Sequence, residues 1–142
     1  MAKKPFSAEL YNNDDDAKDQ FIEWLTDVKG YVAWVNPDDY GIDVLAVKNA
    51  EQFQFEVEVK HNWKGADFPF STVHFSARKL KFATNPERTF FIMFNHERSH
   101  FLSVSGQTIL ESSIVIKDTM YTEDEEFIAV PKAECFFRKF DL

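Results

Sequence analysis

GIDVLAVKNAEQFQFEVEVKH, residues 41–61, predicts two adjacent β-strands at the centre of the fold. The first strand, Gly41–Val47, is apolar apart from Asp43 and closes at the turn Lys48-Asn49-Ala50. In the second, Gln52–His61, aromatic and β-branched residues alternate with polar ones. One face of this strand therefore packs in a core while the other carries charges: Phe53, Phe55, Val57 and Val59 point one way, and Gln54, Glu56, Glu58 and Lys60 the other.

The charged residues of this stretch predict a hydrolytic metal site. Asp43 interrupts an apolar run, where a carboxylate is costly unless it is paired or binds a metal ion. Carboxylates on adjacent strands lie about 5 Å apart, which suits joint binding of one divalent ion by Asp43 and Glu58. Lys60 follows on the same face, where an ammonium group can orient a metal-bound water or stabilise charge on a phosphate. Glu56 shares this face but is explained by a solvated ion pair with Lys60 or a neighbouring strand, so it is not among the predicted site residues.

Gly41-Ile42-Asp43 followed by Glu58-Val59-Lys60 resembles the motif of the PD-(D/E)xK nuclease superfamily, in its Holliday junction resolvase-like branch. The resemblance covers residues 17–94 and implies a restriction-endonuclease-like core of helix, three strands, helix and strand. It also implies that Asp43 and Glu58 bind Mg²⁺, with Mn²⁺ able to substitute, that the Val59 carbonyl completes the coordination, and that Lys60 assists the attacking water. DNA is the implied substrate, and a homodimer would place two such sites on a duplex or junction.

The flanking sequence predicts a single α/β domain over residues 1–142, with a central mixed sheet flanked by helices. The core spans about 17–105. Residues 107–142 add strands or a dimer element. The acidic run Asn12–Asp16 predicts the start of a helix over Ala17–Lys29, whose apolar stripe runs from Ala17 to Val28. The other expected elements are strands at 31–35, 89–94, 101–105, 114–121 and 127–130, a helix at 71–83, and a strand or short helix at 135–140.

Other acids near the motif are weaker candidates. Resolvase-like members often carry a further acid on the first helix, and Asp19 or Glu23 is at a suitable distance. Both lie opposite the stripe centred on Phe21, which favours solvated charges. The literal Pro37-Asp38 pair lies in a stretch whose turn chemistry explains it, so Asp43 is preferred.

Charge limits how such a protein could hold DNA. The chain has a net charge of −8 and a pI near 4.9, which argues against uniform attraction to phosphates. Residues 60–100 carry 7 positive and 3 negative groups, a net +4. Arg78, Lys79 and Lys81 in this segment are the predicted nucleic-acid contacts, although a solvated helix flank explains them equally well.

A second motif, His96-Glu97-Arg98-Ser99-His100, matches the H-E-x-x-H pattern of zinc proteases. That chemistry needs a helix, which places both histidines on one face. Strand-like sequence on both sides predicts a hairpin turn here instead, so a zinc protease is a remote alternative.

Composition excludes several further classes. The sequence has no apolar run of membrane-helix length, no recognisable signal segment and only one cysteine, Cys135, so we expect a cytoplasmic protein with no membrane partner and no organic cofactor. One alternative from a different class stays open. The same fold could serve as a non-catalytic module, an acidic protein that engages another protein or mimics nucleic acid, and the −8 charge favours it.

Overall fold

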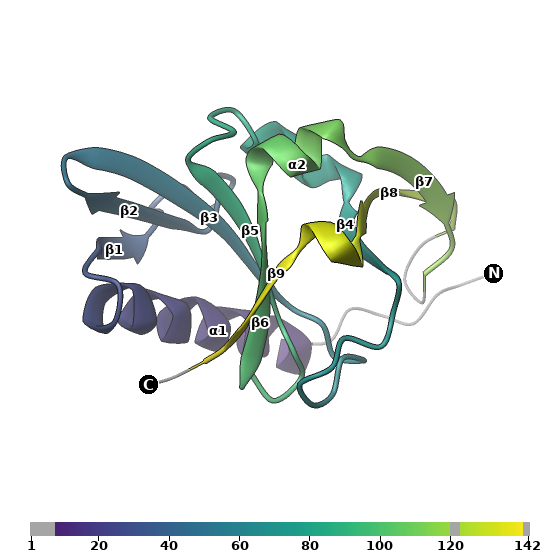
Figure 1. Ribbon diagram of the computed structural model, residues 1–142, viewed down its shortest axis with the longest axis horizontal. Helices are drawn as coiled ribbons and strands as arrows, with labels where there is room; N and C mark the ends of the chain where they lie inside the picture. The colour runs from purple at the N-terminus through teal and green to yellow at the C-terminus, as the bar shows by residue number, and fades with distance from the viewer. Residues whose placement is uncertain (1–7, 120–122, 141–142) are drawn as a thin grey trace.

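The computed structural model, which describes residues 8–119 and 123–140, contains two β-sheets and one long helix (Figure 1). The larger sheet is mixed, because β3 and β5 are parallel while its other neighbours are antiparallel. The predicted α/β fold with a central mixed sheet is therefore confirmed. The strand order of this sheet is β1 (Val32–Val35), β2 (Val44–Lys48), β3 (Glu51–Val59), β5 (Thr89–Phe94), β6 (His100–Ser105) and β9 (Phe136–Lys139). The smaller sheet is antiparallel, in the order β4 (Thr72–Ser76), β8 (Glu125–Pro131) and β7 (Ser113–Lys117).

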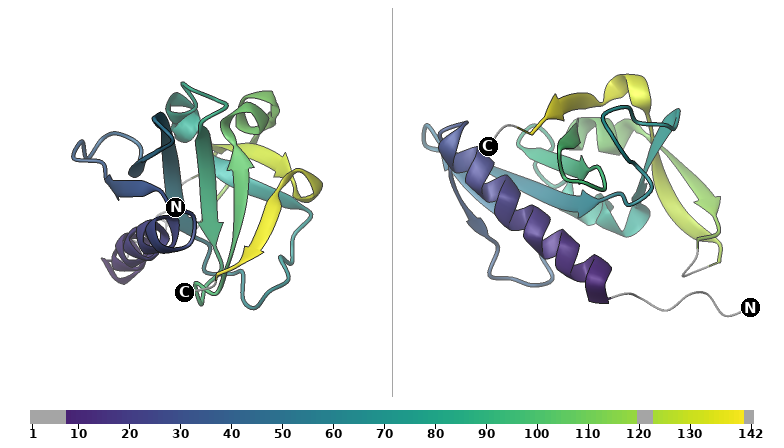
Figure 2. Two further views of the ribbon diagram at one scale, coloured as in Figure 1. Left: turned by 60° about the vertical axis from the view of Figure 1, so that its left-hand side comes forward. Right: turned by 90° about the horizontal axis from the view of Figure 1, so that it is seen from below.

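Helix α1 (Ala8–Asp27) runs obliquely across one face of the larger sheet (Figure 2). Its apolar stripe is buried against the alternating apolar face of β3, as predicted: Ala17, Phe21, Trp24 and Leu25 pack with Phe55, Val57 and Val59. The predicted bounds were wrong at both ends. The helix begins at Ala8, so the acidic run lies inside it, and Val28 follows its end and is 49% exposed.

The opposite face of the larger sheet is covered by the smaller sheet, where a second helix had been predicted. Residues 71–83 form β4 and then a short 3₁₀ helix, η1 (Ala77–Phe82). Val73 and Ala77 have helical spacing, but Val73 and Phe75 also alternate with His74 and are both buried. The burial available on the adjacent sheet favours the strand period, so the helix prediction is wrong.

The C-terminal third contributes to both sheets. β7 and β8 complete the smaller sheet, and residues 135–140 form the edge strand β9, which settles the choice between strand and helix. Two short elements were not predicted: α2 (Gly106–Glu111), whose first turn is capped by Ser105, and the 3₁₀ turn η2 (Lys132–Glu134). The predicted strand at 114–121 extends beyond β7, and its residues 120 and 121 lie outside the described residues.

The β2–β3 hairpin sets the geometry of the candidate site. Its two turn residues, Asn49 and Ala50, have φ values of 53° and 63°, as a tight two-residue hairpin requires. The turn places Lys48 opposite Glu51 and Val44 opposite Phe55. Continuing this register by one residue brings Asp43 beside Glu56. Within the described part of the chain, no helix is long and apolar enough to cross a membrane.

Candidate active site

Asp43 and Glu56 meet across the β2–β3 hairpin. The Asp43 backbone N–H donates a hydrogen bond to Glu56 Oε1 at 3.2 Å, and the Val57 N–H donates to Asp43 Oδ2 at 2.8 Å. Glu56 is only 8% exposed. The expectation of a solvated Glu56 is therefore wrong, since the strand's polar face is covered here by η1 and the smaller sheet.

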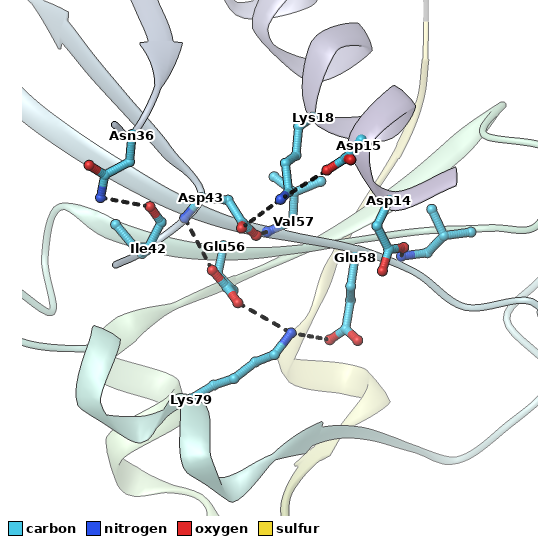
Figure 3. Close-up of polar contacts among 11 residues, drawn as sticks. Asp14, Asp15, Lys18, Asn36, Ile42, Asp43, Glu56, Val57, Glu58 and Lys79 are labelled. Atoms are coloured by element: carbon cyan, nitrogen blue, oxygen red, sulfur yellow. Dashed lines mark hydrogen bonds and ion pairs between the residues drawn. The ribbon is translucent and has the colours of Figure 1, made fainter. Parts of the chain in front are cut away.

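Lys79 connects Glu56 with the next acid on the same strand face. Its ammonium group, on a side chain only 13% exposed, lies 3.3 Å from Glu56 Oε2 and 3.6 Å from Glu58 Oε1 (Figure 3). The second distance is beyond hydrogen-bonding range, so the buried Glu58 Oε1 has no hydrogen-bond partner. Glu56 and Glu58 thus share one half-buried cation.

Helix α1 adds one acid and one cation to this site. Asp14 accepts a hydrogen bond from the Val59 N–H at 3.2 Å, which brings its carboxylate to the Glu58 side of the site (Figure 3). Lys18, one turn further along the helix, lies 3.1 Å from Asp43 Oδ1 and 3.4 Å from Asp15 Oδ1. We call Asp14, Asp43, Glu56 and Glu58 the carboxylate cluster.

The carboxylate cluster holds more negative charge than its two lysines offset. Burial raises the pKa of Asp14 to about 6, and the Glu58 carboxylate adds to this rise. Burial likewise raises the pKa of Glu56 to about 8, with a further contribution from Asp43, although Lys79 opposes it. Burial alone would lower the pKa of Lys79, but Glu58, Glu56 and Asp43 outweigh burial and raise it. Protons are therefore held here that a bound cation would displace.

Lys60 lies outside the network of contacts around Asp43. Its ammonium group lies 5.1 Å from the Phe70 ring centroid. Burial lowers its pKa, Glu58 opposes that effect, and Lys117 adds to it. Lys60 is thus within electrostatic range of Glu58 and of the smaller sheet, and its catalytic role stays a prediction.

The three predicted nucleic-acid contacts occupy different environments. Lys79 is half-buried within the carboxylate cluster, whereas Arg78 and Lys81 are exposed on η1. The Lys81 ammonium lies 5.2 Å from the Phe82 ring centroid. Of the three predicted nucleic-acid contacts, only Arg78 and Lys81 therefore lie on the surface.

The H-E-x-x-H segment forms the β5–β6 hairpin, as predicted, and has no helical geometry. Glu97 Oε1 accepts a hydrogen bond from the Gly65 N–H at 2.7 Å, so this carboxylate stabilises a neighbouring loop. His96 Nδ1 lies 3.4 Å from Nδ1 of His61. These contacts argue against the zinc protease alternative, because the motif's two histidines do not share a helix face.

Several other predictions near the motif can be compared with the structure. The turn at Asn36 is confirmed, with the Asp38 N–H donating to Asn36 Oδ1 at 3.0 Å. Asp19 and Glu23 are exposed, as their position opposite the apolar stripe indicated. Trp63 is fully buried in the second core, between the two sheets.

Sequence reasoning missed Asp14 and Glu56, and each had a usable signal. With the helix extended upstream, Asp14 falls three and seven residues before Ala17 and Phe21, on the buried stripe. A two-residue turn at Asn49 and Ala50 implies the register that brings Glu56 beside Asp43. Lys79 had no such signal, because its contacts depend on how η1 packs.

The composition of the carboxylate cluster fits a divalent, oxygen-preferring cation. Hard ions such as Mg²⁺ bind carboxylate oxygens. Glu58 Oε1 has no hydrogen-bond partner, and burial raises the pKa of Asp14 and Glu56, so a bound cation would stabilise the ionised forms of these carboxyls. As the side chains stand, no three Asp, Glu, His or Cys residues among those the structure describes are grouped as metal ligands. Instead, Lys18 forms an ion pair with Asp43, and Lys79 forms one with Glu56.

The arrangement of a long helix against a mixed sheet is shared with a solved Holliday junction resolvase. One solved structure with this fold is Hjc, a Holliday junction resolvase from Archaeoglobus fulgidus, which matches with a TM-score of 0.54, 11% identity and coverage of 85% of each chain. D212, a nuclease from a fusselovirus, matches with a TM-score of 0.48 and 15% identity over 93% of this chain and 88% of its own. No protein-family model matches the sequence, and neither does any curated protein. The likeness is therefore one of fold.

Proposed function

We propose that this protein is a divalent-metal-dependent nuclease that hydrolyses phosphodiester bonds in DNA. The observation that carries the proposal is the convergence of four carboxylates and a half-buried lysine where β2, β3 and α1 meet, in a chain with a resolvase-like fold. A cluster with perturbed pKa values on such a fold is a functional-site candidate on physical grounds.

Asp43 and Glu58, with Glu56 beside them, would hold the ion through carboxylate oxygens, with Mg²⁺ or Mn²⁺ as the suitable ions. A divalent ion bound there supplies Lewis-acid stabilisation of the phosphate and lowers the pKa of a coordinated water. Asp14 would orient this end of β3 through its hydrogen bond with Val59.

Two lysines are candidates for the cation that stabilises charge on the phosphate. The motif selects Lys60, whereas contact with the carboxylates selects Lys79, which touches both Glu56 and Glu58. A fixed ammonium group beside the reacting phosphate acts by stabilising negative charge in the transition state. We assign this role to Lys79. Lys60 would bind the neighbouring phosphate of the DNA backbone.

The test is cleavage of labelled duplex, single-stranded and four-way-junction DNA with Mg²⁺ or Mn²⁺. Asp43→Asn and Glu58→Gln are the site variants, and Asp19→Asn, an exposed acid on α1, is the matched control. We expect the parent and Asp19→Asn to cut alike, and each site variant to lose at least about a hundredfold, roughly 2.7 kcal/mol of transition-state stabilisation.

Lys60→Gln and Lys79→Gln in the same assay decide between the two lysines. The assignment predicts the larger loss of single-turnover rate for Lys79→Gln and a weaker DNA affinity for Lys60→Gln. A parent that cuts no DNA and takes up no metal would contradict the proposal. The net charge of −8 would then favour the non-catalytic binding module.

A further inference from the structure

A second group of charged side chains lies next to Glu58 but outside the carboxylate cluster. Lys117 Nζ, on β7, lies 3.5 Å from Nδ1 of His74, on β4. Burial lowers the pKa of His74, and Lys117 and Lys60 lower it further, so all three groups are within electrostatic range of one another. We call Lys60, His74 and Lys117 the basic cluster.

The smaller sheet presents this cluster on its outer face. Val73 and Phe75, the neighbours of His74 on β4, are buried against the larger sheet, so His74 points the other way. Lys60 reaches the same place from the end of β3, two residues after Glu58. The basic cluster is therefore assembled from three strands of two sheets.

Aromatic rings lie beside the two lysines of the basic cluster. The Lys60 ammonium lies 5.1 Å from the Phe70 centroid, and the Lys117 ammonium 5.1 Å from that of Phe127. Phe70 is 39% exposed. Glu125 lies opposite Lys117 in the β7–β8 register. An ammonium group has three N–H donors, so a lysine beside a ring face can still donate to an anionic ligand.

Placement and charge together indicate which anion this is. The chain as a whole repels polyanions at a net charge of −8, whereas the basic cluster is electrostatically linked to Glu58 of the proposed cleavage site. Resting on the proposed function, we propose that Lys60, His74 and Lys117 bind a backbone phosphate of the DNA strand next to the phosphate that is cut. The smaller sheet is then the part of the molecule that holds the substrate.

The test is affinity for a fluorescently labelled DNA duplex in EDTA, measured by anisotropy at several salt concentrations, so that no cleavage occurs. The variants are His74→Gln with Lys117→Gln, and Lys117→Glu alone. Lys139→Gln, an exposed lysine on β9, is the matched control. Thermal unfolding verifies that each variant is folded.

We expect the double variant to bind about tenfold more weakly and to show a salt slope smaller by about 1, as loss of one phosphate contact predicts. Lys117→Glu should weaken binding at least as much, and Lys139→Gln should stay within about twofold of the parent. Equal affinity of the parent and the double variant, an equal loss in Lys139→Gln, or no binding by the parent overturns the inference.

Cleavage measured separately with Mg²⁺ separates this inference from the proposed function. A parent that binds DNA through these residues but does not cut it supports the basic cluster and contradicts the nuclease. A parent that cuts DNA while the double variant binds normally supports the nuclease and contradicts the basic cluster.

Discussion

The carboxylate cluster and the β5–β6 hairpin both carry motifs of metal chemistry, but their charges are satisfied differently. In the hairpin, Glu97 accepts a hydrogen bond from the Gly65 N–H. In the cluster, Glu56 is buried with a pKa raised to about 8, and Glu58 Oε1 has no hydrogen-bond partner. The difference teaches that a motif indicates chemistry only where folding leaves its charges uncompensated.

The largest expected effect is on Lys79. Lys79→Gln removes the cation that Glu56 and Glu58 share, so an uncompensated buried carboxylate remains. We expect a loss of about 3 kcal/mol in the free energy of unfolding at pH 8.5, and a smaller loss at pH 6, where Glu56 is protonated. Urea denaturation at the two pH values measures both.

Lys81→Gln is the matched control for that change, because Lys81 lies on the same 3₁₀ helix and is exposed. We expect it to change stability by less than about 0.5 kcal/mol. Equal losses in the two variants would show that Lys79 contributes only to the packing of η1.

A second effect is a fall in stability with rising pH. Because the pKa values of Asp14 and Glu56 are raised in the folded state, to about 6 and about 8, the folded protein binds more protons than the unfolded chain between about pH 4 and pH 8. Their contribution is fully present below the unfolded pKa values and is lost as pH rises through the folded ones.

Asp14→Asn should make that fall shallower and keep an acceptor for the Val59 N–H. After allowance for solvent screening, we expect the variant to gain about 1 kcal/mol relative to the parent at pH 8 in metal-free buffer, and nothing at pH 4. Chemical denaturation across this pH range checks it, and a gain of the same size at both ends would contradict the charge argument.

The smallest effect is expected in the hairpin. Glu97→Gln removes the group that a zinc protease would use as its base but retains Oε1 for the Gly65 N–H. We expect less than about 0.5 kcal/mol change in stability and unchanged DNA cleavage. A loss of cleavage comparable to that of Asp43→Asn would erase the distinction between the two regions.

How far the fold could be predicted depended on whether local pattern and tertiary burial agreed. They agree in β3, whose alternation matches its buried and polar faces, and in the stripe of α1. They disagree at residues 71–83, where helical spacing coexists with a strand that buries Val73 and Phe75. Only the packing of the smaller sheet decides between the two.

The site residues also differ in whether local sequence or tertiary packing determines their positions. Asp43 stood out because it interrupts an apolar strand, and the hairpin register could have added Glu56. Lys79 could not be predicted, because its role depends on a 3₁₀ helix whose packing brings this basic residue into contact with Glu56. Local spacing carries no information about such long-range contacts.

The most direct test of the central claim, that a divalent ion neutralises the carboxylate cluster, is calorimetric titration of Mn²⁺ at pH 7 in two buffers of different ionisation enthalpy. The account predicts binding at millimolar-to-micromolar affinity with release of up to about one proton, since Glu56 with a pKa of about 8 must ionise to bind the ion. Asp43→Asn should weaken this binding and Glu97→Gln should not. No Mn²⁺ uptake by the parent, or equal uptake in Asp43→Asn, would contradict it.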